Sequence, residues 1–252
     1  MLVLTAVVVG GNAIVAAHAW RFTHFAVGGA KTANPEALSP GDRLLVALTG
    51  VVVPRPTLGR LPADVGLSAA SGVEADIVME LAKAHKYDGP LALFGKSMGS
   101  AAVLRAVGVL GARADALVLE NPYDRLTTTV GHRFEAMGLP PQPGAALLVF
   151  WGGVELGFNG FAVNPVDFAV NVRTPTLLLN GDDDPRVHLV EVESIRASLA
   201  GPAEIVVFPN AGHVGLYSAN AALWRSAVTG FLDREAPNGG ARTTSANPQI
   251  TP

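Results

Sequence analysis

Residues 91–107, Leu91-Ala92-Leu93-Phe94-Gly95-Lys96-Ser97-Met98-Gly99-Ser100-Ala101-Ala102-Val103-Leu104-Arg105-Ala106-Val107, form the stretch on which the fold prediction rests. The first four residues are apolar and follow Gly89-Pro90, which is typical of a buried strand entered from a turn. From Ala101 onwards no breaker interrupts the stretch, and apolar residues recur at helical spacing. Because Gly95 and Gly99 frame Ser97, the stretch predicts a cramped strand-to-helix turn. Glycine is frequent here, 28 of 252 residues, so the turn pattern is informative only through its flanking strand and helix.

Later apolar runs continue this alternation of strand and helix. Strands are expected at residues 116–119, 176–179 and 204–208, and helices near 188–200 and at 219–233. A strand, a helix and a second strand in this order form a right-handed parallel crossover. The sequence therefore predicts an α/β fold with a mostly parallel sheet and helices on both faces.

The region before residue 91 shows fewer regular patterns. Leu44–Val53, broken by Thr49-Gly50, has β-like composition and predicts one strand. Residues 54–72 are rich in Pro, Gly and Ala and predict irregular backbone. Ser71, with Glu74 three residues later, matches a capping box and predicts the start of a helix.

Bulk composition limits the classes of function. A chain of 252 residues suffices for one full-sized domain, and 49% hydrophobic with only 15% charged residues indicates a well-buried sheet, membrane contact, or both. The net charge of −3 gives no reason to expect nucleic acid as a partner. The absence of cysteine excludes disulfides and thiolate chemistry.

Residues 2–20 contain no charged side chain, over a length close to that needed to span a bilayer. We consider three interpretations: a membrane anchor over residues 1–22, a signal peptide cleaved at Ala17-His18-Ala19, and a buried helix or misassigned start. The anchor is favoured, because a buried helix rarely lacks a charged face over this length. Arg21 and Lys31 follow the segment and no basic residue precedes it, which favours a cytoplasmic catalytic domain. A signal peptide would instead imply a periplasmic or secreted protein.

Residues 23–233 are expected to form the α/β domain. Residues 121–172 break the alternation and are rich in aromatic residues, Pro and Gly, and we predict a helical lid insertion over the site. The alternative is that these aromatic residues simply pack on the sheet edge. Residues 234–252 are polar and predict a disordered tail.

A serine nucleophile needs a base, and the base needs an orienting carboxylate. Gly181-Asp182-Asp183-Asp184 follows the strand at 176–179, and Gly212-His213 follows the strand at 204–208. Because the carboxyl ends of parallel strands lie at one edge of a sheet, these loops are expected to approach Ser97. The sequence predicts a Ser97–His213–Asp184 triad, with Asp183 as the next candidate acid and His188 as the nearest rival base.

Three motifs of this chain resemble those of the α/β-hydrolase superfamily: Gly95-x-Ser97-x-Gly99, Gly181-x-x-Asp184-x-x-Val187 and Gly212-His213. From about residue 18 to 233 the chain is similar to bacterial members with an N-terminal hydrophobic anchor. The segments that carry this wider likeness are Thr49-Gly50, Pro54-Arg55-Pro56, Glu74-Ala75-Asp76, Phe150-Trp151-Gly152-Gly153, residues 157–161 and Asn164-Pro165.

The resemblance implies a serine hydrolase that cleaves an ester, thioester or amide through an acyl-enzyme, without a metal or organic cofactor. Ser97 would attack, His213 would relay the proton, Asp184 would orient His213, and the Met98 backbone N–H would stabilise the oxyanion. The expected partner is a small-molecule substrate, with an apolar acyl group indicated by the insertion. Membrane association through residues 2–20 is a further expectation.

The chain also departs from the family pattern. Members normally have several strands before the serine turn and a loop that supplies a second oxyanion donor. Neither is recognised here, and a block is missing around residues 67–71, so we expect incomplete N-terminal strands. The gene model is incomplete, or the hydrolase has decayed, or Leu44–Val53 replaces a missing strand. Two alternative functions follow: a catalytically silent binding or scaffold protein, and an acyltransferase or cofactor-free haloperoxidase that uses the same triad.

Overall fold

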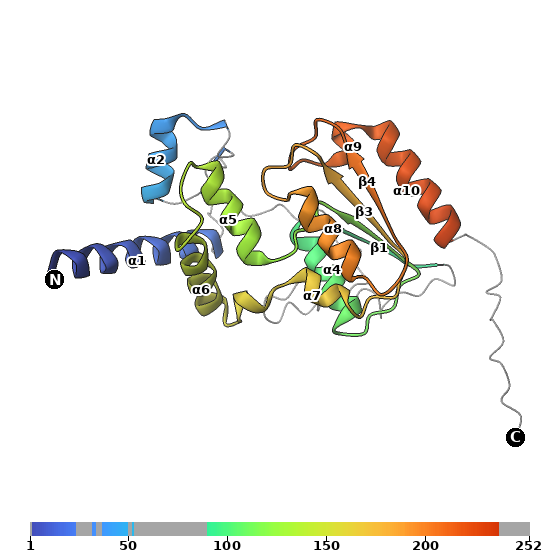
Figure 1. Cartoon of the computed structure of the whole chain (residues 1–252), viewed down its shortest axis with the longest axis horizontal. Coiled ribbons are helices and arrows are strands. Elements are labelled where there is room, and N and C mark those ends of the chain that lie inside the picture. Colours follow the sequence, from blue (N-terminus) through green and yellow to red (C-terminus); the bar gives the residue numbers. More distant parts are fainter. Residues whose placement is uncertain (1, 24–31, 34–36, 50–51, 53–89, 237–252) are drawn as a thin grey trace, which may run out of the picture.

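The computed structural model describes residues 2–23, 32–33, 37–49, 52 and 90–236. Their centre is a parallel sheet of four strands in the order β1-β2-β3-β4. Figure 1 shows this sheet with helices packed around it. The strands are β1 (Ala92–Lys96), β2 (Ala116–Glu120), β3 (Thr176–Gly181) and β4 (Ala203–Phe208). Every residue of β2 and β3 is buried, because helices cover both faces of the inner strands. The α/β class and the parallel sheet are confirmed.

Helices lie on both faces of this sheet. On one face are α4 (Met98–Gly108), α7 (Pro165–Ala169) and α8 (Leu189–Ser198), and on the other α9 (Leu216–Ala219) and α10 (Ala221–Glu235), as Figure 1 shows. Because successive side chains of a strand point to opposite faces of the sheet, each strand contributes alternate residues to two separate hydrophobic clusters. In β2, Leu117 and Leu119 pack in the cluster with α4 and α8, whereas Ala116 and Val118 pack in the cluster with α10.

Within the described residues, β1 is an edge strand. Its register pairs it with β2, and Phe94 on β1 is 54% exposed. A ring contact with Trp224 of α10, at 6.4 Å between centroids, partly covers it. The predicted irregular segment 54–72, the helix expected from Ser71 and the missing block around 67–71 lie outside the described residues.

The strand expected at Leu44–Val53 is wrong, because its first part belongs to helix α2 (Pro40–Thr49). The Asp42 backbone N–H donates to Ser39 Oγ at 3.2 Å, so Ser39 caps this helix, and Pro40 occupies its first position. Ser39-Pro40 is the sequence signal for the start of this helix, although the residues that follow have β-like composition. With no strand beside it among the described residues, the apolar run gains more from helical hydrogen bonds.

The N-terminal helix α1 (Leu2–Thr23) packs against α6 (Gly144–Leu156) of the insertion. The Trp151 indole N–H donates to Asn12 Oδ1 at 2.8 Å, and Ala19 is buried. In the part of the chain that the structure describes, no helix has both the length and the apolar character needed to cross a membrane. The anchor expected over residues 1–22 remains a prediction.

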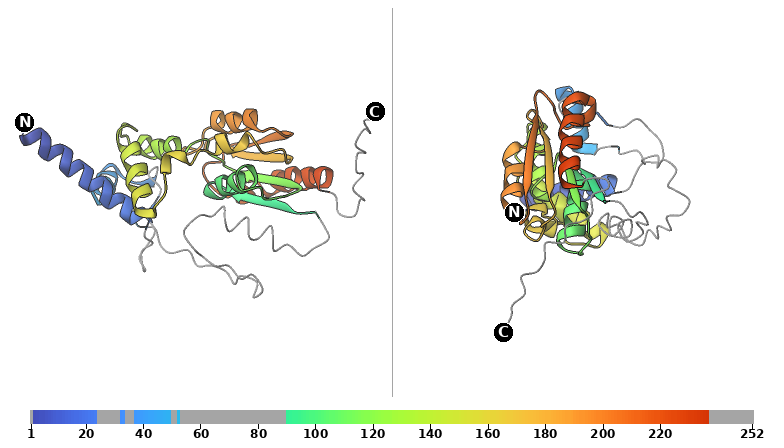
Figure 2. Two further views of the ribbon diagram at one scale, coloured as in Figure 1. Left: turned by 90° about the horizontal axis from the view of Figure 1, so that it is seen from below. Right: turned by 90° about the vertical axis from the view of Figure 1, so that its right-hand side faces the viewer.

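The insertion between β2 and β3 is helical. It contains α5 (Leu126–Ala136), α6, the 3-10 turn η2 (Gly160–Ala162) and α7. Figure 2 shows α5 and α6 beside α1, at the opposite end of the molecule from α10. The lid role of residues 121–172 remains a prediction. At the other terminus α10 runs to Glu235, past the expected start of the tail, and residues 237–252 lie outside the described residues.

Candidate active site

Ser97 occupies the single residue between β1 and α4. Its φ of 51° and ψ of −113° lie in a region that residues with a Cβ rarely adopt. The Ser97 N–H donates to the Glu120 carbonyl at 2.8 Å, and the Ser100 hydroxyl lies 2.9 Å from the Gly95 carbonyl oxygen. These contacts over-determine the turn, so the strained serine is held at the carboxyl end of the sheet.

The two glycines of the turn have different roles. A Cβ on Gly95 would lie 2.5 Å from the Gly99 carbonyl oxygen, so only glycine fits where the helix start crosses the strand end. A Cβ on Gly99 would meet no heavy atom within 4 Å. Close approach of the backbone therefore explains why residue 95 is glycine. It does not explain the glycine at residue 99, where a Cβ would have open space.

The structure brings His213 between Ser97 and Asp184. His213 Nε2 lies 3.1 Å from Ser97 Oγ, and His213 Nδ1 lies 2.8 Å from Asp184 Oδ2. Asp184 is 3% exposed, and its Oδ1 accepts hydrogen bonds from the N–H groups of Arg186 at 2.8 Å and Val187 at 3.0 Å. One carboxylate oxygen is thus held by backbone while the other faces the imidazole.

The neighbouring aspartates point elsewhere. Asp182 and Asp183 are exposed, and Asp182 Oδ1 accepts from the Asn210 N–H at 2.7 Å, which ties the β3 loop to the β4 loop. Gly181 brings the loops together, because a Cβ there would lie 2.0 Å from the Ala211 carbonyl oxygen. Of the three consecutive aspartates, Asp184 is the one whose carboxylate contacts His213.

Met98, the expected oxyanion residue, is the first residue of α4. Its N–H is among the donors of a helix N-terminus that have no partner within the helix. Its side chain is held from the β2 side, where the buried Tyr123 hydroxyl donates to Met98 Sδ at 3.1 Å. Because Met98 directly follows Ser97, its N–H belongs to the same turn.

Sequence reasoning missed Glu120, a buried carboxylate at the end of β2. Its Oε1 accepts from the Leu216 N–H at 3.1 Å, and its Oε2 accepts from the Trp224 indole N–H at 3.2 Å. The Lys96 ammonium, beside Ser97, lies 3.7 Å from Oε1. A glutamate that ends an otherwise apolar buried strand was the signal that could have found it.

His188, the rival base, lies at the N-terminal cap of α8 rather than beside Ser97. Its N–H donates to Glu191 Oε1 at 2.9 Å. Partial burial, followed by the charge of the nearby His132, lowers the pKa of His188. Burial raises the pKa of Glu191 to about 8, although the hydrogen bond from His188 opposes this.

The family model of the prolyl oligopeptidase family matches residues 90–238, which is more than half of the chain. This chain belongs to the prolyl oligopeptidase family. Its parallel sheet with helices on both faces agrees with that assignment, within the α/β-hydrolase superfamily. The matched range begins just before β1 and contains all three residues of the predicted triad.

Individual relatives are distant. The uncharacterized protein YqkD of Bacillus subtilis (strain 168) is 23% identical over 159 residues, which covers 62% of this chain and 52% of the relative. This chain thus spans about half the length of that curated relative. Among solved structures, the Pyrococcus furiosus esterase Pf2001 has 22% identity and a TM-score of 0.45, with 57% of this chain and 54% of that chain covered. The Pyrococcus horikoshii acylaminoacyl peptidase has 19% identity and a TM-score of 0.48, with 64% and 27% covered.

Proposed function

We propose that this protein is a serine hydrolase that cleaves an ester, thioester or amide bond through an acyl-enzyme. The observation that carries the proposal is the continuous line of contacts from Ser97 Oγ through His213 to Asp184. A serine hydroxyl is a weak nucleophile, and it becomes effective when an adjacent imidazole takes its proton. Membership of the prolyl oligopeptidase family supports the same reaction class.

In the proposed reaction, Ser97 Oγ attacks the substrate carbonyl carbon while His213 Nε2 accepts the hydroxyl proton. Asp184 Oδ2 accepts a hydrogen bond from His213 Nδ1–H, which selects the tautomer with a free Nε2 and stabilises the imidazolium. The Met98 N–H donates to the oxyanion of the tetrahedral intermediate. His213 then protonates the leaving group, which departs and leaves the acyl-enzyme. In the second half of the reaction, His213 takes a proton from a water molecule whose oxygen attacks the acyl carbon, and the bond to Ser97 Oγ breaks as His213 returns the proton to Oγ.

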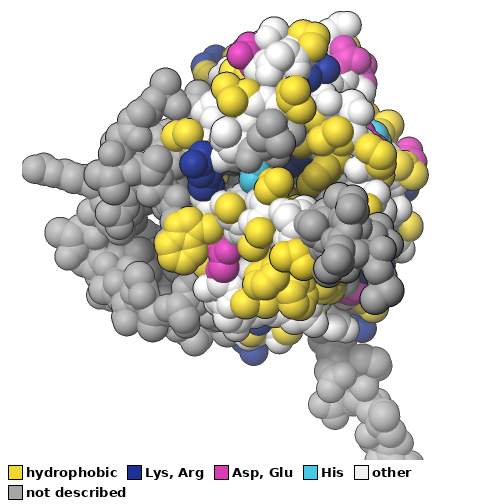
Figure 3. Space-filling view, turned by 90° about the vertical axis from the view of Figure 1, so that its left-hand side faces the viewer, with side chains coloured by type: hydrophobic (Ala, Val, Ile, Leu, Met, Phe, Trp, Pro, Cys, Tyr) yellow, Lys and Arg dark blue, Asp and Glu magenta, His cyan; other side chains and the backbone are white. Residues whose placement is uncertain are grey.

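An apolar acyl group is the substrate class that the insertion favours. An open hollow of about 430 Å³ in the insertion is lined by Val149, Phe150, Gly153, Val154, Gly157, Phe158, Asn159, Gly160 and Phe161. Figure 3, which views the molecule from the α1 and α6 side, shows hydrophobic side chains gathered over that face. Apolar walls of this kind suit an acyl chain or an apolar amino-acid side chain. The residues that line the hollow belong to the insertion and include none of Ser97, Asp184 and His213.

Covalent labelling of the purified full chain with a fluorophosphonate probe tests the proposal. We expect one adduct, located on Ser97 by mass spectrometry of peptides, and none in Ser97→Ala. A folded protein that stays unlabelled at Ser97 would contradict the hydrolase and support the silent binding protein instead. Circular dichroism of both forms establishes that they are folded.

A further inference from the structure

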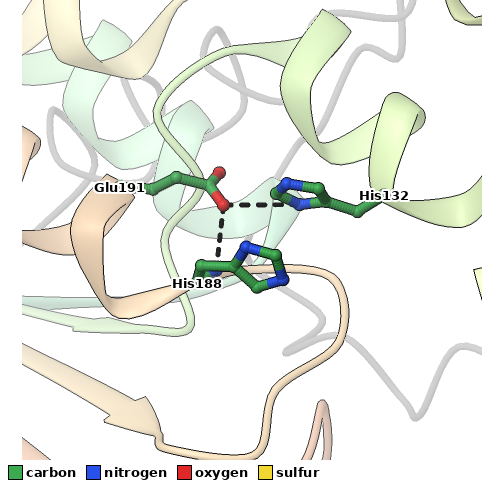
Figure 4. Close-up of side chains that lie close together, drawn as sticks. All are labelled: His132, His188 and Glu191. Atoms are coloured by element: carbon green, nitrogen blue, oxygen red, sulfur yellow. Dashed lines mark hydrogen bonds and ion pairs between the residues drawn. The ribbon is translucent and has the colours of Figure 1, made fainter. Parts of the chain in front are cut away.

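His132, His188 and Glu191 form a second group of chemically active side chains, separate from Ser97 (Figure 4). His132 comes from α5 of the insertion, whereas His188 caps α8 and Glu191 lies in its first turn. One candidate ligand atom from each residue lies within 4.8 Å of the other two. The two imidazole rings are stacked, with 4.0 Å between their centroids.

The surroundings hold these side chains toward one another. His132 Nδ1 lies 3.0 Å from the Arg186 carbonyl oxygen and 3.4 Å from Glu191 Oε1. Glu191 Oε1 also accepts from the His188 N–H. Figure 4 shows the Glu191 carboxylate directed between the two histidines. Two segments distant in the sequence, α5 and the start of α8, therefore meet at one carboxylate.

The second oxygen of Glu191 is the independent observation that points to a ligand. Glu191 is 3% exposed, and among the described residues its Oε2 has no partner at hydrogen-bond geometry, although the carboxyl group of Asp124 lies beside Glu191 and adds to the burial that raises its pKa. A buried carboxylate oxygen without a donor is costly, because it has lost its water. A bound cation would satisfy it, and the two neighbouring imidazoles are nitrogen donors that transition metals prefer.

We propose that His132, His188 and Glu191 bind a divalent transition-metal ion of the Zn²⁺ type. Two histidines and one glutamate are a ligand set that zinc accepts, with water in the fourth position. At zinc bond lengths of about 2.0–2.2 Å, tetrahedral ligand atoms lie about 3.4 Å apart. The three candidate ligand atoms lie within 4.8 Å of one another, so metal binding requires them to draw closer together, and His188 is the exposed member of the group.

The bound ion would join the insertion to the loop that carries the proposed catalytic acid. His132 belongs to α5, and the Arg186 carbonyl beside it lies two residues after Asp184, whose carboxylate accepts from the Arg186 N–H. The ion would act as a structural clamp between these segments. The reaction proposed at Ser97 has no step that uses it, so metal binding and serine reactivity are separately measurable.

Zinc titration of the chelator-treated full chain tests the site. We expect one Zn²⁺ per chain by calorimetry and by competition with a chromophoric chelator, together with a rise in Tm. His188→Ala and His132→Ala should each weaken Zn²⁺ binding about tenfold or more, because each removes a ligand. Glu191→Gln keeps an oxygen for the His188 N–H and removes the charge, so it should weaken binding as well.

His213→Ala is the matched control, since it removes the other described histidine that lies beside a buried carboxylate. It should leave Zn²⁺ affinity unchanged. Absence of Zn²⁺ binding to the wild-type chain would overturn the proposal. Wild-type affinity in His188→Ala, or loss of binding in His213→Ala alone, would also overturn it. Because His188 is exposed, its alanine variant is expected to fold even if Glu191→Gln does not.

Discussion

The Glu120 carboxylate accepts a hydrogen bond of 3.1 Å from the Leu216 backbone N–H, three residues after His213. The carbonyl of the same residue accepts from the Ser97 N–H at 2.8 Å. One residue at the end of β2 therefore contacts both the turn that carries the serine and the loop that carries the histidine. The Glu120 side chain accepts from Leu216 and Trp224, so Glu120 acts on the site as a positioning residue.

Glu120→Ala should destabilise the protein and slow labelling at Ser97. The substitution leaves the Leu216 N–H and the Trp224 indole N–H without their acceptor, which costs about 1–3 kcal/mol of unfolding free energy. Urea unfolding measures the loss, and the fluorophosphonate labelling rate reports the displacement of His213. Glu193→Ala, at an exposed position of α8, is the control and should change stability by less than about 0.5 kcal/mol. Equal stability of the two variants would contradict the role assigned to Glu120.

Asp184→Asn should lower turnover by about 10⁴, because an amide that donates to His213 Nδ1 selects the wrong tautomer. Asp183→Asn is the matched control, since Asp183 is exposed one position earlier in the same loop. Its turnover should stay near that of the wild type. Steady-state kinetics on a chromogenic ester or amide that the wild type cleaves provides the measurement. Unchanged turnover in Asp184→Asn would show that another residue orients the histidine.

Gly95→Ala and Gly99→Ala should behave differently although the two glycines flank the same serine. The new Cβ at residue 95 collides with the Gly99 backbone, and such overpacking costs about 1–3 kcal/mol. The new Cβ at residue 99 has open space, so Gly99→Ala should change stability by less than about 0.5 kcal/mol or raise it. Thermal unfolding compares the pair. A larger loss in Gly99→Ala would refute the packing described for the turn.

The hydrogen bond between Trp151 and Asn12 predicts energetic coupling between α6 and α1. In a double-mutant cycle with Trp151→Phe and Asn12→Ala, the coupling energy should be about 0.5–1.5 kcal/mol. The cycle is measured by chemical unfolding of the purified full chain. A coupling energy of zero would contradict a stabilising hydrogen bond between Trp151 and Asn12.

Helix α1 is also the segment predicted to be a membrane anchor, and extraction tests that prediction. An anchor that leaves α6 for a bilayer would keep the protein in the membrane fraction during carbonate extraction. Complete release by carbonate would exclude a spanning anchor over residues 1–22. N-terminal mass analysis of the mature protein distinguishes cleavage after Ala19 from retention of the helix.

Local sequence patterns predicted the main elements of the sheet because they are short-range properties. Apolar runs at 116–119, 176–179 and 204–208 became β2, β3 and β4, and the Gly-framed turn at Ser97 lies between β1 and α4. The strand expected at Leu44–Val53 is instead partly helical, because a β-like composition also fits a helix when Ser39 and Pro40 begin one. Packing partners decide between the two, and these are not visible in one segment.

The order of Ser97, Asp184 and His213 in the chain, and the position of each after a strand of the parallel sheet, can be read from the amino-acid sequence. Which of the three adjacent aspartates contacts His213 depends on the folded loop, because backbone hydrogen bonds within it set the direction of each side chain. Only the tertiary structure joins Glu120 to Leu216, and His132 to Glu191, across more than fifty residues. Contacts of that range arise when the sheet aligns the strand ends, and no local pattern encodes them.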